Sequence, residues 1–192
     1  QVYVSGDYCY IGHIPNKEML GATILDISDP ANPRIAATIT QEEPDSHSHK
    51  ARVIGDLMIV NHELNTFGIG RKSEQLPPVR AQLREVLGRD PNDGELAERL
   101  GMDVADFPNM IEAEKNPYDR GKFKIYNVSD PSRASLLHYQ KTGGKGVHRF
   151  DMDDRYAYIS TEMDGYRVNI LVNYDISDPT SPKEVSRWWM PG

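Results

Sequence analysis

The feature that most constrains this chain is a short phrase that occurs three times. It reads LDISDP at residues 25–30, YNVSDP at residues 126–131 and YDISDP at residues 174–179. Each copy runs from an apolar segment into a Ser-Asp-Pro step. This step favours a turn, because the Asp side chain can bond the backbone just ahead of it and Pro fixes φ. A phrase that returns with the same turn chemistry indicates a structural repeat.

Alignment of the three copies on this turn predicts four short strands in each unit. The predicted strands are residues 1–5, 8–13, 22–27 and 34–40 in the first unit; 50–54, 57–62, 123–128 and 135–140 in the second; and 149–152, 156–161, 169–176 and 184–189 in the third. Units of roughly forty residues with four strands are typical of β-propeller blades. The predicted fold class is therefore all-β, a β-propeller segment of about three four-stranded blades. The predicted blades are residues 1–40, 47–141 and 146–190.

The second blade is interrupted at residues 66–120, where the period of the apolar residues changes from two to about four. Asn92 followed by Glu95 predicts a capping box at the start of a helix, and Gly101 suits the C-terminal cap of that helix. Residues 87–102 resemble the helix-turn-helix of sigma-factor region three, but the acidic balance of the segment disfavours DNA binding. We expect a helical insertion that serves as a lid or docking arm.

The composition argues against several classes of partner. The formal net charge is −7 and the pI about 5.4, which disfavours a general affinity for nucleic acid or for an anionic membrane surface. No apolar run approaches the length of a membrane span, so we expect a soluble protein, either cytoplasmic or periplasmic. The single cysteine, Cys9, excludes an internal disulfide and leaves the compartment open.

Three blades do not close a ring, because propellers typically have four to eight. The chain also begins directly in a strand-like alternation, without an initiator Met. We therefore expect a trimmed chain or a fragment, completed by further blades of the same longer chain or of a partner chain.

Two histidines fall at the same position of consecutive repeats. When the tight turns of the blades are aligned, His49 and His148 both lie just before the innermost strand, where side chains of successive blades converge on the axis. The second strand returns antiparallel, which brings Glu63 behind His49 and Glu162 behind His148. Imidazoles with carboxylates that accept their second N–H are typical of transition-metal sites. We predict the two histidines as metal ligands and the two glutamates as their supports.

Other side chains are weaker candidates for substrate contacts or extra ligands. They are His13 and His62, at the same end of the first two blades, and Tyr166, in a turn of the third. His47 is interpreted as an exposed loop residue that could turn inwards. Two alternatives to a metal site stay open: histidines that serve a structural hydrogen-bond network, and a substrate site without a metal.

Three segments resemble the LVIVD-repeat proteins, which are bacterial and archaeal β-propellers. They are ILVNYDISDP at residues 170–179, GVHRF at 146–150 and YAYIS at 156–160. The resemblance extends over all three predicted blades but not over the helical insertion, and it implies the propeller fold. More distantly, the histidine spacing is similar to that of selenium-binding/methanethiol-oxidase propellers and carotenoid-cleaving oxygenases, which hold copper or iron on the axis. This resemblance implies copper or iron, and manganese is kept as a third candidate.

The function hypothesis is a metal-dependent oxidoreductase or oxygenase that acts on a small organic substrate at the axial face. The alternative is a non-catalytic propeller scaffold that binds a protein partner through its rim and its helical insertion. The two hypotheses differ at His49 and His148. A metal site requires these imidazoles to be neutral and to converge, whereas a scaffold would tolerate their loss apart from a cost in stability.

Overall fold

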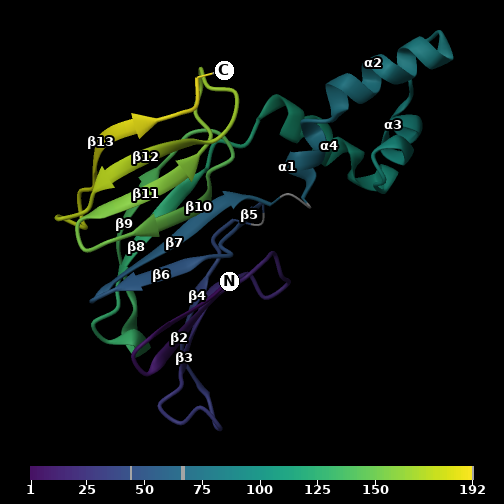
Figure 1. Ribbon diagram of the computed structural model, residues 1–192. Coiled ribbons are helices and arrows are strands. Elements are labelled where there is room, and N and C mark those ends of the chain that lie inside the picture. Colours follow the sequence, from purple (N-terminus) through teal and green to yellow (C-terminus); the bar gives the residue numbers. More distant parts are fainter. Residues whose placement is uncertain (44, 66–67, 192) are drawn as a thin grey trace. The chain divides into compact units, whose positions relative to one another are not determined.

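The structure is a computed structural model that describes residues 1–43, 45–65 and 68–191. The chain forms two compact units, which Figure 1 shows as a group of sheets and a group of helices. The sheet unit comprises Gln1–Glu63 and Asp119–Gly192, and the helical unit comprises Leu64–Tyr118. Within the described residues, no helix is both long enough and apolar enough to cross a membrane.

The sheet unit contains three antiparallel sheets that follow one another along the chain. The first sheet is β1 (Val2–Ser5), β2 (Tyr8–Gly12), β3 (Leu20–Asp26) and β4 (Arg34–Thr40). The second is β6 (Ala51–Ile54), β7 (Leu57–Leu64), β8 (Lys122–Asn127) and β9 (Ser135–Lys141), and the short β5 (Ser46–His47) also joins β7. The third is β10 (Val147–Met152), β11 (Tyr156–Thr161), β12 (Ile170–Asp175) and β13 (Lys183–Trp188). The chain is therefore mostly β, as predicted, although its described residues form no closed ring of sheets.

The repeated phrase forms the same turn in all three sheets. In each copy the Asp of the Ser-Asp-Pro step accepts a hydrogen bond from the backbone N–H two residues further on. The bonds are Ala31 to Asp29 at 3.1 Å, Ser132 to Asp130 at 3.0 Å and Thr180 to Asp178 at 3.0 Å. In the second sheet the turn continues as a 3-10 helix, η2 (Pro131–Arg133). The predicted turn chemistry is confirmed, and it places the third and fourth strands of each sheet side by side.

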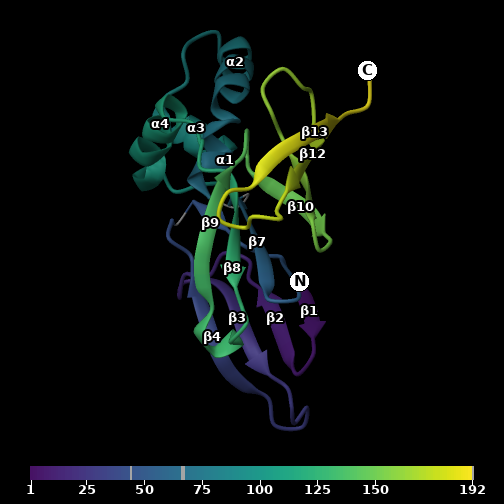
Figure 2. The same ribbon diagram turned by 90° about the vertical axis from the view of Figure 1, so that its left-hand side faces the viewer.

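The second sheet packs between the other two, as Figures 1 and 2 both show. Met58 and Ile59 are neighbours on β7, and both are fully buried. Because successive strand residues point to opposite faces, Met58 packs into the core shared with the first sheet and Ile59 into the core shared with the third. Tyr10 joins the first core and Phe150 the second.

Backbone pairing continues from one sheet to the next at one end of the unit. His13, just beyond β2, pairs with Ser48, which lies between β5 and β6 of the second sheet. In the same way Glu63 on β7 pairs with Gly146, which lies just before the third sheet. The end of the second strand of one sheet is therefore held against the segment that enters the next sheet.

The helical unit contains α1 (Ile69–Ser73), α2 (Leu76–Leu87), α3 (Asp93–Arg99), η1 (Val104–Asp106) and α4 (Phe107–Lys115). The predicted capping box is present, because the Asn92 side chain accepts from the Glu95 N–H at 3.0 Å while the Glu95 carboxylate accepts from the Asn92 N–H at 2.9 Å. Gly101 follows α3 with φ +61. The core of this unit consists of Leu76, Leu96, Ala97, Phe107 and Met110. Residues 66 and 67, at the predicted start of the insertion, lie outside the described residues.

Candidate metal centre

Three side chains from two segments meet at the end of the second sheet. His47 belongs to β5, His49 lies two residues further on, and Glu63 lies near the end of β7. The Nε2 atom of His47 is 3.1 Å from Glu63 Oε1, and the Nδ1 atom of His49 is 3.3 Å from the same oxygen. One ligand atom from each residue lies within 4.8 Å of the others. Imidazole and carboxylate groups at this spacing could hold a transition metal.

His47 was expected to be an exposed loop residue, and that expectation is wrong. Its exposed fraction is 8%, and its ring lies 4.8 Å from the ring of His49, measured between centroids. The sequence contains a signal for this arrangement, because residues two apart in an extended segment point to the same side. The segment is extended because β5 pairs with β7, a pairing between parts of the chain that no local pattern reveals.

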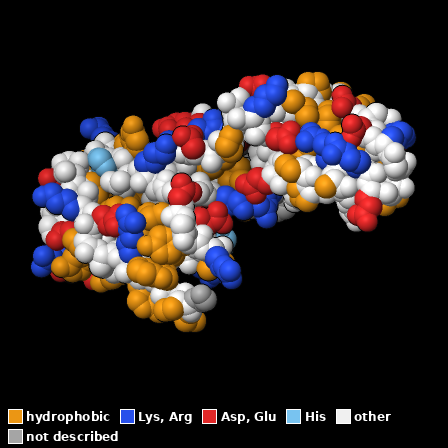
Figure 3. Space-filling view, turned by 90° about the horizontal axis from the view of Figure 1, so that it is seen from above, with side chains coloured by type: hydrophobic (Ala, Val, Ile, Leu, Met, Phe, Trp, Pro, Cys, Tyr) orange, Lys and Arg blue, Asp and Glu red, His pale blue; other side chains and the backbone are white. Residues whose placement is uncertain are grey.

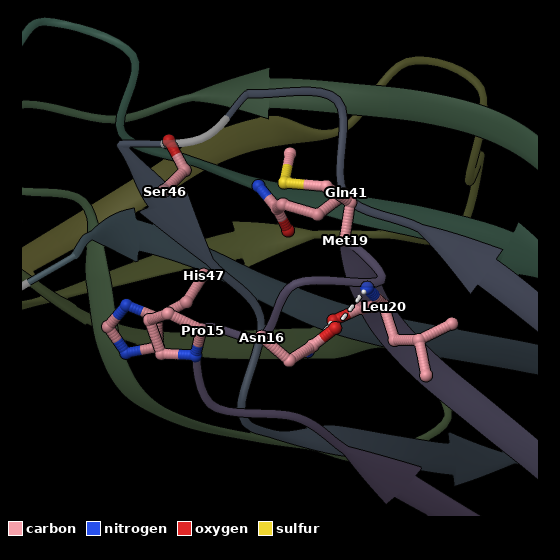
Figure 4. A pocket seen from close by; sticks show the side chains of 7 residues that line it. All are labelled: Pro15, Asn16, Met19, Leu20, Gln41, Ser46 and His47. Carbon is pink, nitrogen blue, oxygen red and sulfur yellow. Dashed lines mark hydrogen bonds between the residues drawn. The ribbon is translucent and has the colours of Figure 1, made fainter.

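A small cavity borders His47. It has a volume of about 20 Å³, and Figure 4 shows Asn16 and Gln41 among the side chains that line it together with His47. The Nδ1 atom of His47 is buried and has no hydrogen-bond partner among the described residues. The cavity is large enough for one water molecule. His47 thus directs one ring nitrogen towards Glu63, and the other has no hydrogen-bond partner within the described part of the chain.

Asn61 fixes the position of His49. This fully buried side chain accepts a hydrogen bond from the Lys50 N–H at 2.8 Å and donates one to the Val147 carbonyl at 2.9 Å. Its Nδ2 atom also lies 3.1 Å from His49 Nδ1. Asn61 therefore links the segment that carries His49 to the entrance of the third sheet, where His148 follows. Asn61 was not among the site residues predicted from the sequence.

His148 approaches the same carboxylate from the third sheet. Its Nδ1 atom is 3.1 Å from Glu63 Oε2, and its ring centroid is 5.7 Å from that of His49. The structure therefore brings together His49, His148 and Glu63, three of the four residues predicted for the site. His148 is more exposed than the other members, with 52% of its side chain accessible.

The pairing predicted for His148 is one residue out of register. The structure pairs Val147 with Thr161 and Arg149 with Ser160, so that His148 is the extra residue of a β-bulge. A bulge redirects the side chain that it contains. The carboxylate that contacts His148 is therefore Glu63 of the neighbouring sheet. Glu162, which was expected behind His148, instead lies 3.8 Å from Lys145 Nζ.

The local electrostatics favour neutral His49 and ionised Glu63. Burial, together with the nearby Lys50 ammonium, lowers the pKa of His49 to about 3. Burial alone would raise the pKa of Glu63, but the hydrogen bond from His47 and the nearby His49 and His148 hold this pKa below its ordinary value. A neutral imidazole and a carboxylate are the protonation states that bind metals.

His62 is not part of this group, because it lies on the opposite face of β7 from its neighbour Glu63. It is fully buried, with Nδ1 3.1 Å from Gln41 Nε2 and Nε2 2.7 Å from Glu43 Oε2. Burial lowers the pKa of His62 to about 4, although the hydrogen bond to Glu43 opposes this change. Both ring nitrogens are therefore occupied, which argues against the predicted role of His62 as an extra ligand.

The partners of His62 also hold the two residues that flank His47. The Ser48 hydroxyl donates to Gln41 Oε1 at 2.9 Å, and the Ser46 hydroxyl donates to Glu43 Oε2 at 3.2 Å. This buried network anchors β5, and with it His47, against the end of β7.

Two further predicted residues lie outside the group. His13 Nε2 is 2.8 Å from the Thr23 hydroxyl, within the first sheet. Tyr166, in the loop between β11 and β12, packs edge-on against Trp189 with 5.1 Å between the ring centroids.

Comparison with known proteins identifies the repeat. The family model of the LVIVD repeat matches two segments of the chain, residues 1–40 and 153–188. These segments correspond to the first sheet and to most of the third, and they confirm the predicted LVIVD resemblance there, whereas the second predicted blade and residues 146–150 lie outside the match. No curated protein matches the chain.

Proposed function

We propose that this LVIVD-repeat chain binds a transition metal through His47, His49 and Glu63, and that the metal serves an oxidoreductase or oxygenase reaction on a small organic molecule. The observation that supports metal binding is the spacing of the ligand atoms. Atoms bound at about 2.1 Å from one metal ion stand about 3.0 Å apart in an octahedral site and about 3.4 Å apart in a tetrahedral one. The two imidazole nitrogens lie 3.1 and 3.3 Å from Glu63 Oε1.

The donor set supports iron among the candidate metals. Two histidines and one carboxylate are the ligands of the non-haem Fe(II) oxygenases, in which the remaining coordination positions are open. When bound, such a metal supplies a Lewis acid or an oxygen-activating centre. His148 is exposed and lies 3.1 Å from Glu63 Oε2, a position suited to a fourth ligand or to a substrate contact.

Lys50 opposes metal binding at His49. Its Nζ atom contacts His49 Nε2, and it also donates to the His148 carbonyl at 2.6 Å. Metal binding at Nδ1 would require the proton on Nε2, so Lys50 would have to leave this contact. The substitution Lys50→Met removes both the contact with His49 and the positive charge. We expect this variant to bind the metal more tightly than the wild-type chain.

The experiment is an anaerobic titration of metal-free protein with Fe(II), and in parallel with Mn(II) and Cu(I), followed by calorimetry. We expect one ion per chain, and an affinity at least about 100-fold lower in His47→Ala, His49→Ala and Glu63→Gln. The matched control is His138→Ala, which removes a histidine of β9 outside the group. Absence of stoichiometric binding, or binding that survives all three substitutions in folded protein, would refute the proposal and leave a structural network in which the imidazoles donate to Glu63.

The scaffold function is the second candidate, and a feature of the helical unit favours it. A hollow of about 350 Å³ lies between α2 and α3, lined by Leu83, Leu87, Glu95, Glu98 and Arg99. A partner helix with an apolar face and a basic edge would fit such a groove. If the chain is only a scaffold, loss of His47 and His49 should change its stability but not the binding of that partner.

A further inference from the structure

A basic residue directly follows each of the two repeated histidines. Lys50 follows His49 at the entrance to β6, and Arg149 follows His148 on β10. The strands β6 and β10 are in contact with each other. Lys50 Nζ donates to the carbonyl of His148, and that peptide group joins His148 to Arg149. The two cations therefore enter the sheet unit side by side, next to the candidate metal centre.

The next charged residues along the two strands show which way these side chains point. Arg52 lies two residues after Lys50, and Asp151 lies two residues after Arg149. Lys50 continues β6, because its carbonyl accepts from the Asn61 N–H at 3.2 Å. Side chains two residues apart on a strand point to the same side. Since Arg52 Nε lies 3.4 Å from Asp151 Oδ1, the sides that carry Lys50 and Arg149 also face each other.

The two levels of this contact differ in their charges. At the level of Arg52 and Asp151 the charges are opposite, and the Arg52 guanidinium also lies over the Tyr3 ring, 5.0 Å from its centroid. At the level nearer the histidines, Lys50 and Arg149 are both cationic. Like charges that face each other between strands repel. An anion between them would remove this repulsion.

Arg149 has no compensating partner. Its side chain is exposed, and it makes no hydrogen bond or ion pair with any residue that the structure describes. Its charge reaches Lys50, because it adds to burial in lowering the pKa of the Lys50 ammonium, against the opposing effect of Glu63. Over the face shown in Figure 3, by comparison, basic and acidic side chains are intermixed, so that surface charges offset one another.

The proposed metal centre would increase the positive charge at this place. Metal ligands bind as neutral imidazoles and as a carboxylate, so a divalent ion held by His47, His49 and Glu63 retains one net positive charge. Lys50 would also leave its contact with His49 when the metal binds, and would then need another partner. His148, between the two cations in sequence, is open to solvent. A ligand can therefore reach this group.

We propose that the substrate of this site is an organic carboxylate, whose charged group is bound by Arg149 and Lys50 beside the metal. The inference rests on the metal centre proposed above. A guanidinium presents two parallel N–H groups that match the two oxygens of a carboxylate, and an ammonium adds a compact second charge. A neutral substrate would leave both cations without a partner.

The test is calorimetric titration at low ionic strength with benzoate and with its uncharged analogue benzamide. Protein loaded with Mn(II) and metal-free protein are both titrated. We expect loaded wild-type protein to bind benzoate about tenfold more tightly than benzamide, and Arg149→Gln to remove this preference. Arg34→Gln is the matched control, because it removes an exposed arginine of β4 and changes the net charge equally. Benzoate binding should be unchanged in that variant.

The metal-free titration separates this inference from the metal proposal. Without metal, Lys50 keeps its contact with His49, so benzoate should bind more weakly, and by linkage it should raise the affinity for Mn(II) by the same factor. If Mn(II) binds but benzoate and benzamide bind equally, or Arg149→Gln binds benzoate as the wild type does, the carboxylate site is wrong and the metal centre stands. If Mn(II) does not bind, the metal centre is wrong. Benzoate binding to the metal-free chain that is lost in Arg149→Gln and kept in Arg34→Gln would then support the carboxylate site alone, and its absence would refute that site too.

Discussion

Replacement of Gly146 by alanine should destabilise the sheet unit more than any other single glycine substitution tested alongside it. Gly146 has φ +96, a conformation that side chains with a β-carbon rarely adopt. An added Cβ would lie 2.4 Å from the His62 carbonyl oxygen, 2.8 Å from Gly121 Cα and 2.9 Å from Glu63 Cα. All three are backbone atoms, so relief requires the end of β7 to move away from the entrance of the third sheet.

The expected cost has two parts. An alanine held in the left-handed region costs about 1–2 kcal/mol. Forcing extra volume into a close-packed contact costs about 1–3 kcal/mol more, so the free energy of unfolding should fall by about 2–5 kcal/mol. Alanine substitutions at two other glycines should show each part of the cost alone. Gly165 has φ +87 with nothing within 4 Å of an added Cβ, whereas a Cβ on Gly12 would lie 2.3 Å from the His49 carbonyl carbon without a positive φ.

The assay is equilibrium urea unfolding followed by tryptophan fluorescence. Trp188 and Trp189, the two tryptophans of the chain, both lie in the sheet unit, so the signal does not report on the helical unit. We expect Gly165→Ala to cost about 1–2 kcal/mol and Gly146→Ala to cost clearly more, because only the latter adds the collision. Equal losses in the free energy of unfolding for the two variants would show that the backbone at Gly146 lies farther from the end of β7 than in this structure.

Three further predictions concern other parts of the molecule. Burial lowers the pKa of His62 from its ordinary 6.5 to about 4, so between these pH values the unfolded chain binds the extra proton and stability falls as the pH falls. His62→Gln should reduce this slope by about 1.4 kcal/mol per pH unit in urea titrations repeated from pH 7 to pH 4, and an unchanged slope would contradict the assignment. Asn61→Ala removes bonds to the Lys50 N–H and the Val147 carbonyl, and should cost about 2–5 kcal/mol by the same assay, while Asn169→Ala, at an exposed position with an exposed bond to Ser160, should cost less than about 0.5 kcal/mol. Asn92→Ala removes the capping box of α3. The free energy of opening of that helix, measured by amide hydrogen exchange, should fall by about 1 kcal/mol, whereas Asn109→Ala on the exposed side of α4 should leave it unchanged.

The sequence predicted the strands well because the signal for them is local. The Ser-Asp-Pro turns and the tight turns at Gly6 and Gly55 set the phase of each sheet, and β4 and β11 begin and end where they were expected. The strand β5 was missed, since a two-residue strand has no periodicity to detect. The bulge at His148 was missed for a related reason, because only the pairing with β11 shows that one residue is extra.

The site was predicted in part because it follows from the repeat. His49 and His148 converge since they occupy the same position in adjacent sheets, and Glu63 lies between them as the antiparallel return of β7 requires. His47 and Asn61 escaped detection because neither is repeated: the positions that correspond to them in the third sheet are Gly146 and Ser160. A method based on equivalent positions cannot find residues that occur in one copy.

The difference between Glu63 and Glu162 shows what converts a repeated position into a site. The two glutamates are equivalent along their strands, yet Glu63 is 6% exposed and contacts three imidazoles, whereas Glu162 lies at the surface beside Lys145. Glu63 owes its burial to the next sheet, whose entrance pairs with it at Gly146 and supplies His148. No sheet among the described residues covers the third sheet in this way. Burial excludes water and brings the imidazoles close to the carboxylate, so the chemistry of this position depends on the sheet that follows it. Glu162, which no described sheet covers, therefore lacks the surroundings that bury Glu63.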